Sequence, residues 1–295
     1  MTTVGADPRD SVRRALAEDL GSDELAVVGD VTSALSGASS QRGRGSIRAK
    51  AAGVLAGLEC ALEVFRALDA GCTLSPALRD GDAFEPGDEV LRFEGAMAPL
   101  LAAERTALNF LQRLSGVATR TSQFVERVAG TGARILDTRK TTPGLRHLEK
   151  AAVVAGGGEN HRIGLFDQVL LKENHFGFAR PASYEDVVRR CAAGHDRPVI
   201  AEARSVDEAL AAVRGGAGVV LLDNFSAGES LRAAVTAVQE CARSLGRAVE
   251  TEASGGIVLE NVRDYAECGV DRISVGSLTH SAPAVDLSMI VEGVQ

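Results

Sequence analysis

The sequence predicts an α/β protein in which an α+β domain precedes a parallel sheet. The first observation is a repeat: after residue 112, short β-branched runs alternate with alanine-rich helical stretches. This alternation favours parallel strands joined by crossover helices. The second observation is that strand runs such as Val219–Leu222 are almost wholly apolar, as expected for strands covered on both faces. The repeat fits either an α/β barrel or an open doubly wound sheet.

The third observation is the length of the repeat. Six strand–helix units occupy about 145 residues, whereas a complete eight-fold barrel takes about 250. If these units form a barrel, we therefore expect it to be incomplete and open, within residues 113–281. The expected strands are Arg134–Asp137, Gln168–Leu171, Pro198–Ala201, Val219–Leu222, Ala248–Thr251 and Arg272–Val275.

Residues 1–112 are expected to form the N-terminal domain. Pro99 opens a long helical pattern, and a second helix is expected after Gly116. Residues 282–295 are expected to form a terminal helix that packs back on the first domain. The other expected elements are an amphipathic helix at Asp10–Leu20 closed by Gly21, a loop at Ser33–Gly45, strands at Ser46–Ala51, Leu74–Leu78 and Glu89–Phe93, and a helix at 57–69.

Charge and composition exclude several classes of partner. The chain of 295 residues has a formal net charge of -8 and a pI near 5.3, so no dense basic face for nucleic acid or anionic lipid is expected. Its five cysteines contain no C-x-x-C pair, which indicates a reducing compartment and gives no zinc signal. The sequence contains no secretory signal pattern and no apolar run of about 20 residues, and we expect a cytoplasmic protein.

Charged residues or glycines follow every expected strand of the repeat. In parallel α/β folds, ligands bind at the carboxyl ends of the strands, so these residues are the candidate binding residues. They divide into cations, carboxylates and two glycine loops whose backbone N–H groups can hold a phosphate. In strand order they are Thr138–Thr142, Lys172–His175, Glu202, Asp223–Asn224, Glu252 with Ser254–Gly256, and Gly276–Ser277.

Lysine and histidine are concentrated in the same region. Only four of the 32 basic residues are lysines, and two of the four are Lys140 and Lys172. A lysine supplies a compact point charge where the planar fork of arginine does not fit. His161 and Arg162 follow the glycine run Gly156–Gly158, which lacks the ending of a P-loop and the frame of a dinucleotide site. These residues predict that the acidic chain holds anions in a local pocket.

These residues also carry a family resemblance over nearly the whole chain. The motifs are ERTALNF at 104–110, SGVAT at 115–119, DTRKTTPGLR at 137–146, NHR at 160–162, KENH at 172–175 and SGGI at 254–257. They resemble those of quinolinate phosphoribosyltransferase. The resemblance implies an α/β-sandwich N-terminal domain, an open α/β barrel, and a homodimer with active sites at the subunit interface.

The resemblance also implies a pentosyltransferase activity that requires magnesium. In this reaction phosphoribosyl pyrophosphate and quinolinate give nicotinate mononucleotide, pyrophosphate and carbon dioxide, within NAD biosynthesis. The residues implied for quinolinate are Thr138, Arg139, His161, Arg162, Lys172 and, from the partner subunit, Arg105. Those implied for phosphoribosyl pyrophosphate are Lys140, Glu202, Asp223, Ser254, Gly255, Gly256, Gly276, Ser277 and Leu278. Lys140, Glu202 and Asp223 are the expected catalytic residues, and the two carboxylates are the expected magnesium ligands, directly or through water.

Two alternatives remain open at this stage. The first is a phosphoribosyltransferase of the same fold that acts on nicotinate or another acid. The set Arg139, Arg162 and Lys172 argues for two carboxylates on the substrate and against this alternative. The second is a non-catalytic anion-binding relative, which would have no use for Glu202 and Asp223. The residue that supplies a proton after decarboxylation is not predicted.

Overall fold

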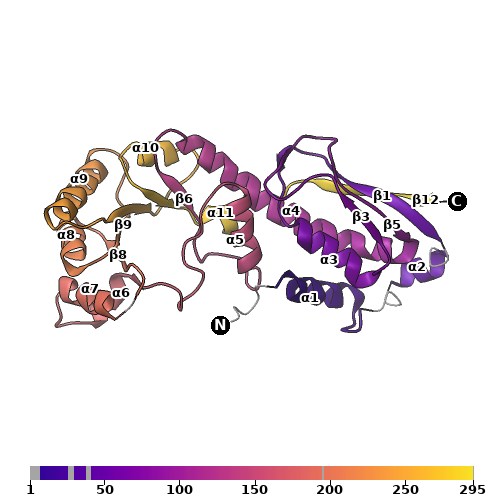
Figure 1. The fold of residues 1–295 in the computed structure, drawn as a ribbon, viewed down its shortest axis with the longest axis horizontal. Coiled ribbons are helices and arrows are strands. Elements are labelled where there is room, and N and C mark those ends of the chain that lie inside the picture. The colour runs from indigo at the N-terminus through magenta and orange to yellow at the C-terminus, as the bar shows by residue number, and fades with distance from the viewer. Residues whose placement is uncertain (1–6, 26–29, 38–40, 195, 295) are drawn as a thin grey trace. The chain divides into compact units, whose positions relative to one another are not determined.

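Two units of the chain each build their own sheet (Figure 1). The computed structural model describes residues 7–25, 30–37, 41–194 and 196–294. The first unit comprises Met1–Ser122, Thr141–Gly157 and Leu278–Gln295, and the second comprises Gln123–Lys140 and Gly158–Ser277. Each unit is therefore assembled from segments that are distant in the sequence. Within the described residues, no helix has both the length and the apolar character needed to cross a membrane.

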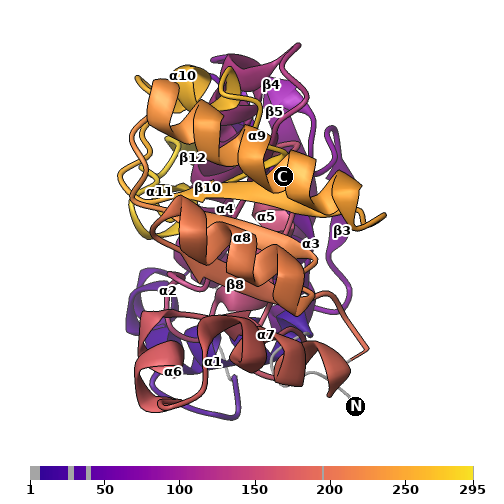
Figure 2. The ribbon, with the colours of Figure 1, turned by 90° about the vertical axis from the view of Figure 1, so that its left-hand side faces the viewer.

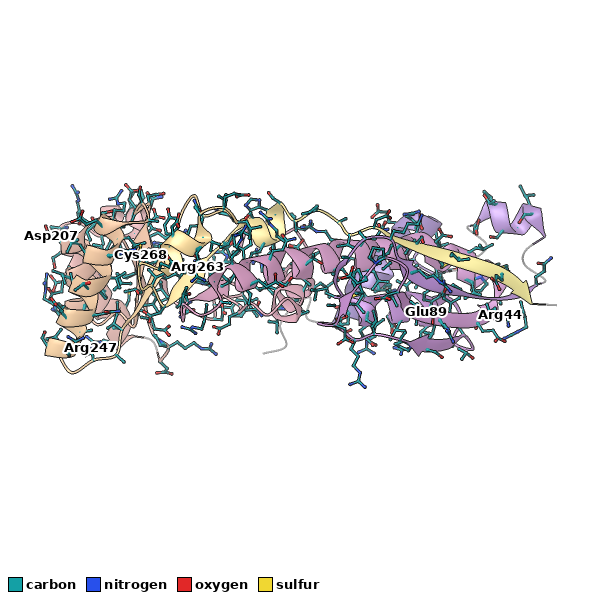
Figure 3. The ribbon with its side chains drawn as sticks, turned by 90° about the horizontal axis from the view of Figure 1, so that it is seen from above. Arg44, Glu89, Asp207, Arg247, Arg263 and Cys268 are labelled. Atoms are coloured by element: carbon teal, nitrogen blue, oxygen red, sulfur yellow. The ribbon has the colours of Figure 1, made fainter. Side chains whose placement is uncertain are left out.

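An antiparallel sheet forms the centre of the first unit. Its strands lie in the order β12 (Leu287–Val294), β1 (Arg42–Ala49), β5 (Glu89–Ala96) and β3 (Thr73–Pro76), while β2 (Gly53–Val54) and β4 (Ala83–Phe84) pair separately. On one face, Phe93 of β5 stacks on Phe65 of α3 (Leu58–Leu68), with ring centroids 5.1 Å apart. Arg44 and Glu89, both labelled in Figure 3, form ion pairs with Glu292 and Arg48. The sheet thus packs one face on helices and leaves charged side chains exposed, a common arrangement for antiparallel strands.

The helices of the first unit begin and end largely where capping residues predict. Helix α1 (Pro8–Leu20) begins after Asp7, whose side chain accepts the N–H of Arg9, and ends at Gly21, which has a φ of 67°. The segment expected to be a loop at Ser33–Gly45 is only partly one, because it overlaps α2 (Val31–Ser36) and β1. The remaining helices are α5 (Arg146–Ala155), α11 (Ser277–His280) and the long α4 (Met97–Val128).

Helix α4 is continuous, so the expected break at Gly116 is wrong. A glycine inside a helix costs about 1 kcal/mol relative to alanine, which is why the sequence favoured two helices. Here the missing side chain has a packing purpose. A Cβ atom added to Gly116 would lie 2.1 Å from the carbonyl oxygen of Pro283, so only glycine allows this segment of the chain to lie against the helix.

The end of the chain forms strand β12, and the expected terminal helix at 282–295 is wrong. Strand β12 pairs antiparallel with β1 from Ala49↔Leu287 to Arg42↔Val294. The run S-M-I-V contains β-branched residues that favour a strand, and the unpaired edge of β1 supplies its hydrogen-bonding partners. This long-range pairing overrides the local helical pattern. The segment does belong to the first unit.

A six-stranded parallel sheet forms the centre of the second unit. Its order is β6 (Arg134–Leu136), β11 (Arg272–Ser274), β10 (Glu250–Ser254), β9 (Val219–Asp223), β8 (Ile200–Ala203) and β7 (Leu170–Leu171). Every expected strand of the repeat is confirmed. Strands β6 and β7 are consecutive in sequence but lie at opposite ends of this order, and within the described residues they do not pair. The sheet is therefore the partly open barrel that the sequence predicted.

Helices cover the outer side of these strands. Figure 2 shows α7 (Tyr184–Ala193), α8 (Val206–Gly215) and α9 (Glu229–Ser244) in a row over the sheet, and each contacts the next. The short helices α6 (Glu173–Phe178) and α10 (Val262–Ala266) complete the unit. Arg263 of α10, labelled in Figure 3, donates to the carbonyl oxygen of Ala129 at 2.8 Å and so caps the end of α4.

The strand register arranges inward side chains in layers. Partners at the same register in parallel strands point to the same face. The first layer contains the apolar residues Leu170, Ile200 and Val219 and, at the register of Val219, Glu250 of β10. The next layer towards the carboxyl ends contains Glu202, Leu221, Glu252 and Arg272, and the layer above it contains Asp223, Ser254 and Ser274. Polarity therefore rises towards the carboxyl edge, where the candidate site residues lie.

We expect Gly116→Ala to lower the free energy of unfolding by about 1–3 kcal/mol, because the new Cβ atom meets backbone that cannot move aside. Gly177→Ala is the matched control, since Gly177 is also helical and a Cβ atom there has no neighbour within 4 Å. Urea denaturation of both variants measures the difference. Equal stabilities would show that the approach of Pro283 does not require glycine.

Candidate active site at the carboxyl edge of the parallel sheet

Most of the predicted site residues gather at one edge of the second unit's sheet. Because the strands are parallel, their carboxyl ends meet there. Strand β6 is followed by Thr138, Arg139 and Lys140, and β7 is preceded by His161 and Arg162 and followed by Lys172. Glu202 lies in β8, and Asp223 ends β9. The end of β10 carries Ser254, Gly255 and Gly256, and β11 is followed by Gly276 and Ser277. Two predicted residues belong to the first unit: Arg105 on α4 and Leu278 on α11.

Two carboxylates, Glu202 and Asp223, lie on neighbouring strands and are partly buried. Burial is the main cause that raises the pKa of Glu202, and the negative charge of Asp223 adds to it. Burial also raises the pKa of Asp223, although the positive charges of Lys172, Arg204 and Lys140 oppose the rise. The pair therefore consists of like charges that a bound cation would stabilise.

The cations of the site come from three segments, one after β6, one before β7 and one after β7. The positive charges of Lys172 and Lys140 both lower the pKa of Asp223, so the two lysines are near enough to this carboxylate to interact with it. Burial lowers the pKa of the Arg162 guanidinium, and the positive charge of Arg139 lowers it further. Two arginines held together against their mutual repulsion form a binding place for a planar dianion, which two planar guanidinium groups can contact bidentately.

Aromatic packing fixes the strand that carries Glu202. The hydroxyl group of Tyr184 donates to the backbone carbonyl oxygen of Glu202 at 2.7 Å. The ring of Tyr184 stacks on Phe176, with centroids 3.8 Å apart and an interplanar angle of 12°. The backbone N–H of Glu173 lies 3.4 Å from Glu202 Oε1, at the start of α6. Helices α6 and α7 thereby hold the carboxylate from both its backbone and its side chain.

The glycine loop after β10 is tied to the end of β9. Gly255 and Gly256 have φ angles of 97° and 64°, which favour glycine. Asn224 also has a positive φ, 58°, and its backbone N–H donates to Ser254 O at 3.2 Å. Its side-chain amide donates to Asp223 Oδ2 at 2.6 Å. The loop thus leaves backbone N–H groups for an anion beside the carboxylate pair.

His161 is buried within a polar network. Its backbone N–H donates to Asp137 Oδ1 at 2.9 Å, and its ring Nδ1 accepts the backbone N–H of Arg162 at 2.7 Å. Its Nε2 lies 3.5 Å from Glu252 Oε1, and Glu252 Oε2 lies 3.1 Å from Nε of Arg272. Asp137 and Glu252 have no exposed surface. Three strands, β6, β10 and β11, therefore meet at this histidine.

Arg105 lies in a cavity of the first unit. The cavity has a volume of about 670 Å³ and is lined by residues of α1, α4 and the segment Pro143–Leu145. Its charged lining residues are Arg14, Glu18, Asp19, Arg105 and Arg113. Arg105 is exposed in the single chain, so its side chain is accessible to a ligand or to another subunit.

Family models match both parts of the chain. Residues 30–115 match the N-terminal domain of quinolinate phosphoribosyl transferase, and residues 117–290 match its C-terminal domain. The chain belongs to the quinolinate phosphoribosyltransferase family. The contacts within the folded chain place residues 141–157 and 278–295 in the first unit.

Relatives in this family match the chain over most of its length. A nicotinate-nucleotide pyrophosphorylase (carboxylating) of Mycobacterium leprae is 39% identical over 95% of this chain and 96% of its own. A probable enzyme of the same name from Bacillus subtilis is 39% identical over 83% of this chain and 82% of its own. The structure of the nicotinate-nucleotide pyrophosphorylase from Francisella tularensis superposes with a TM-score of 0.86, at 35% identity, over 97% of this chain and 96% of that one.

Tyr184 was not singled out from the sequence, whereas His175, Asn224 and Glu252 were among the candidate binding residues but without their partners. Tyr184, His175 and Asn224 act on site residues through hydrogen bonds, and Glu252 acts through charge. The only sequence signal for Tyr184 is that the chain has two tyrosines. Asn224 and Glu252 were noted as residues near strand ends, but their partners lie on other strands, and a single sequence does not show which strands are neighbours.

We expect Glu202→Gln to raise the melting temperature at pH 8 by about 1–3 °C while lowering activity. The raised pKa means that ionised Glu202 destabilises the fold as the pH rises through the interval between its ordinary and its raised value. Removing the charge should raise the melting temperature above that pH interval and leave it unchanged below it. The difference in melting temperature between the variant and the wild type should therefore vanish near pH 4. Exposed Glu260→Gln is the control. A gain that is independent of pH would contradict this account.

Proposed function

We propose that this chain transfers the phosphoribosyl group of phosphoribosyl pyrophosphate to quinolinate and releases carbon dioxide and pyrophosphate. The product is nicotinate mononucleotide, a precursor in NAD biosynthesis. One observation carries the proposal: a cluster of cations and a pair of carboxylates lie at the same edge of the parallel sheet in a member of the quinolinate phosphoribosyltransferase family. The cluster suits the acid, and the pair suits the sugar and a metal ion.

Quinolinate has two adjacent carboxylates on a planar ring, and the cations at the edge match that shape. Arg139 and Arg162 offer planar forks for one or both carboxylates, and Lys172 offers a point charge. Binding the dianion would offset the repulsion that lowers the pKa of Arg162. Thr138 adds a hydroxyl group beside the arginines. These groups therefore hold the ring and fix the direction of its nitrogen atom.

Glu202 and Asp223 supply hard oxygen ligands for Mg²⁺ and acceptors for the ribose hydroxyl groups. Mg²⁺ on a diphosphate commonly takes only one or two protein carboxylates. The described residues contain no cluster of three or more metal-ligating side chains, so a metal cage built only from protein is not offered there. The raised pKa values of the pair support the fit, because a cation would remove the repulsion. When bound, Mg²⁺ neutralises charge on the diphosphate.

The transfer breaks the bond between the anomeric carbon and the pyrophosphate oxygen and forms one to the pyridine nitrogen. Positive charge develops on the sugar, where Glu202 and Asp223 stabilise it, while Lys140 stabilises the negative charge of the leaving group. The ring nitrogen of the adduct is positive and stabilises the carbanion left when the adjacent carboxylate departs as carbon dioxide. A proton then replaces the carboxylate. No covalent intermediate with the protein is required.

The phosphate of the sugar is assigned to the two glycine loops. Ser254–Gly256 present backbone N–H groups beside Asn224, and Gly276–Leu278 lead into α11. Both loops follow the last two strands of the sheet, the position at which phosphate sites are frequent in α/β barrels. A phosphate there and the ring at the arginines would place the ribose next to Glu202 and Asp223.

We also propose a cytoplasmic homodimer in which Arg105 reaches the site of the partner subunit. The location of Arg105 in an accessible cavity supports the proposal, since a residue on the first unit can then serve a second copy of the chain. A two-fold dimer would provide two equivalent shared sites. A larger oligomer built from such dimers is compatible with the same arrangement.

The purified protein should form nicotinate mononucleotide and carbon dioxide from quinolinate, phosphoribosyl pyrophosphate and Mg²⁺. Nicotinate should be a poorer substrate by about 100-fold or more in kcat/KM, because it would leave one of the site's cations without its carboxylate. Product chromatography and release of labelled carbon dioxide measure both reactions. Comparable turnover of the two acids would favour the alternative, a same-fold enzyme for nicotinate. No turnover of either acid would favour a non-catalytic anion-binding relative.

Complementation tests the shared site. Arg105→Ala and Lys140→Ala should each be nearly inactive, but the two refolded together in equal amounts should recover about a quarter of wild-type activity. Half of the dimers would then be mixed, with both lesions in one site and none in the other. Refolded wild type and Arg127→Ala, an exposed arginine on the same helix, are the controls. No recovery, with mixed dimers shown to form, would place Arg105 in its own subunit's site.

A further inference from the structure

Glu252 is a fully buried carboxylate close to the site that has no part in the transfer described above. It lies on β10 two residues before Ser254, with an exposed fraction of 0%. Its contacts with His161 and Arg272 are close enough for ion pairing, but within the described residues neither oxygen makes a hydrogen bond of good geometry. Burial favours the neutral form, yet His161, Arg272 and Ser274 outweigh burial and keep the pKa of Glu252 below its ordinary value. The group is therefore a buried anion at neutral pH.

The ring of His161 lies between two protein groups. Nδ1 accepts the backbone N–H of Arg162 at 2.7 Å, so Nδ1 carries no proton and the proton of the neutral ring is on Nε2. Nε2 lies 3.5 Å from Glu252 Oε1, within ion-pair distance. Both ring nitrogens thus contact protein. A histidine that donates a proton to substrate needs one nitrogen directed at the reacting carbon.

We infer that Glu252 is a positioning residue that acts through His161 on Arg162, and that His161 is this link and not the proton donor after decarboxylation. The inference rests on the proposed function, because it assigns Arg162 to quinolinate. The contacts form a continuous series. The carboxylate of Glu252 contacts Nε2 of the His161 ring, and Nδ1 of the same ring accepts the backbone N–H of Arg162. Asp137 holds the backbone of His161 from the other side, at the end of β6.

Such a link is needed because Arg162 and Arg139 repel one another. Without a fixed backbone, the two guanidinium groups would separate in the empty site and lose the spacing that two adjacent carboxylates require. The Arg162 side chain donates a 3.3 Å hydrogen bond to the backbone carbonyl oxygen of Gln168. Misplacement of a binding group by about 1 Å is enough to cost up to 100-fold in rate. The buried carboxylate of Glu252 therefore influences the affinity for quinolinate through the position of Arg162.

The isosteric variant Glu252→Gln tests the inference. Its side chain offers one acceptor where the carboxylate offers two, so it cannot accept from both His161 and Arg272. We expect KM for quinolinate to rise about tenfold, with KM for phosphoribosyl pyrophosphate changed less than twofold. Glu250→Gln is the matched control, because Glu250 lies on the same strand and contacts Arg272 but not His161. It should retain wild-type constants.

A double-mutant cycle distinguishes a link from two independent losses. His161→Gln should raise the quinolinate KM by a similar factor, and adding Glu252→Gln to it should change KM less than twofold further. The pH profile of kcat should keep both limbs in His161→Gln. If Glu252→Gln does not fold, as judged by circular dichroism, His161→Gln decides the question with the same two measurements.

Three outcomes would overturn the inference. They are additive effects of the two substitutions, an unchanged quinolinate KM in Glu252→Gln, and a fall in kcat of about 100-fold or more in His161→Gln with loss of one limb of the pH profile. The wild-type reaction is run alongside. An inactive wild-type enzyme would refute the proposed function itself, whereas an active one with Glu252→Gln equal to Glu250→Gln would refute only the role of Glu252.

Discussion

Like charges held close together at one strand edge are the constraint on which the rest of the second unit depends. Glu202 lies beside Asp223, and Arg162 beside Arg139. Burial and the charge of Asp223 raise the pKa of Glu202, and burial and the charge of Arg139 lower the pKa of Arg162, so a bound ion of opposite sign would offset the repulsion within each pair. The parallel register makes this arrangement achievable, because it brings the ends of six strands to one edge and supports them on an apolar layer.

The surrounding residues oppose that repulsion with rigid contacts. Tyr184 holds the backbone of Glu202, Asn224 holds the carboxylate of Asp223, and His161 holds the backbone of Arg162. The first of these contacts joins α7 to β8, whereas the other two are made between neighbouring residues and fix the local conformation at the strand end and in the loop. A site prepared in this way loses little conformational freedom when a ligand binds, and more of the interaction energy is available for affinity and for the transition state.

Local patterns predicted the repeat, its strand ends and the open barrel, because an apolar run followed by a charged residue is visible within a few positions. Long-range pairing was not predictable in this way. Strand β12 forms only because β1 offers an unpaired edge, and α4 continues through Gly116 only because Pro283 lies against it. The same reason explains the site. The motif residues were found from local sequence, but Tyr184 and the link from Glu252 to His161 depend on which strands are neighbours.

Pairing of the first sheet's strand β1 with the last strand of the chain has a consequence for biosynthesis. On the ribosome, roughly 240 residues must be added after β1 before its partner emerges, which takes on the order of tens of seconds at bacterial rates. During that time one edge of β1 has no partner, and an open strand edge can pair with another nascent chain. The first unit is thus completed after the second, although most of its residues are made first, and its sheet closes only once residues 287–294 have been made.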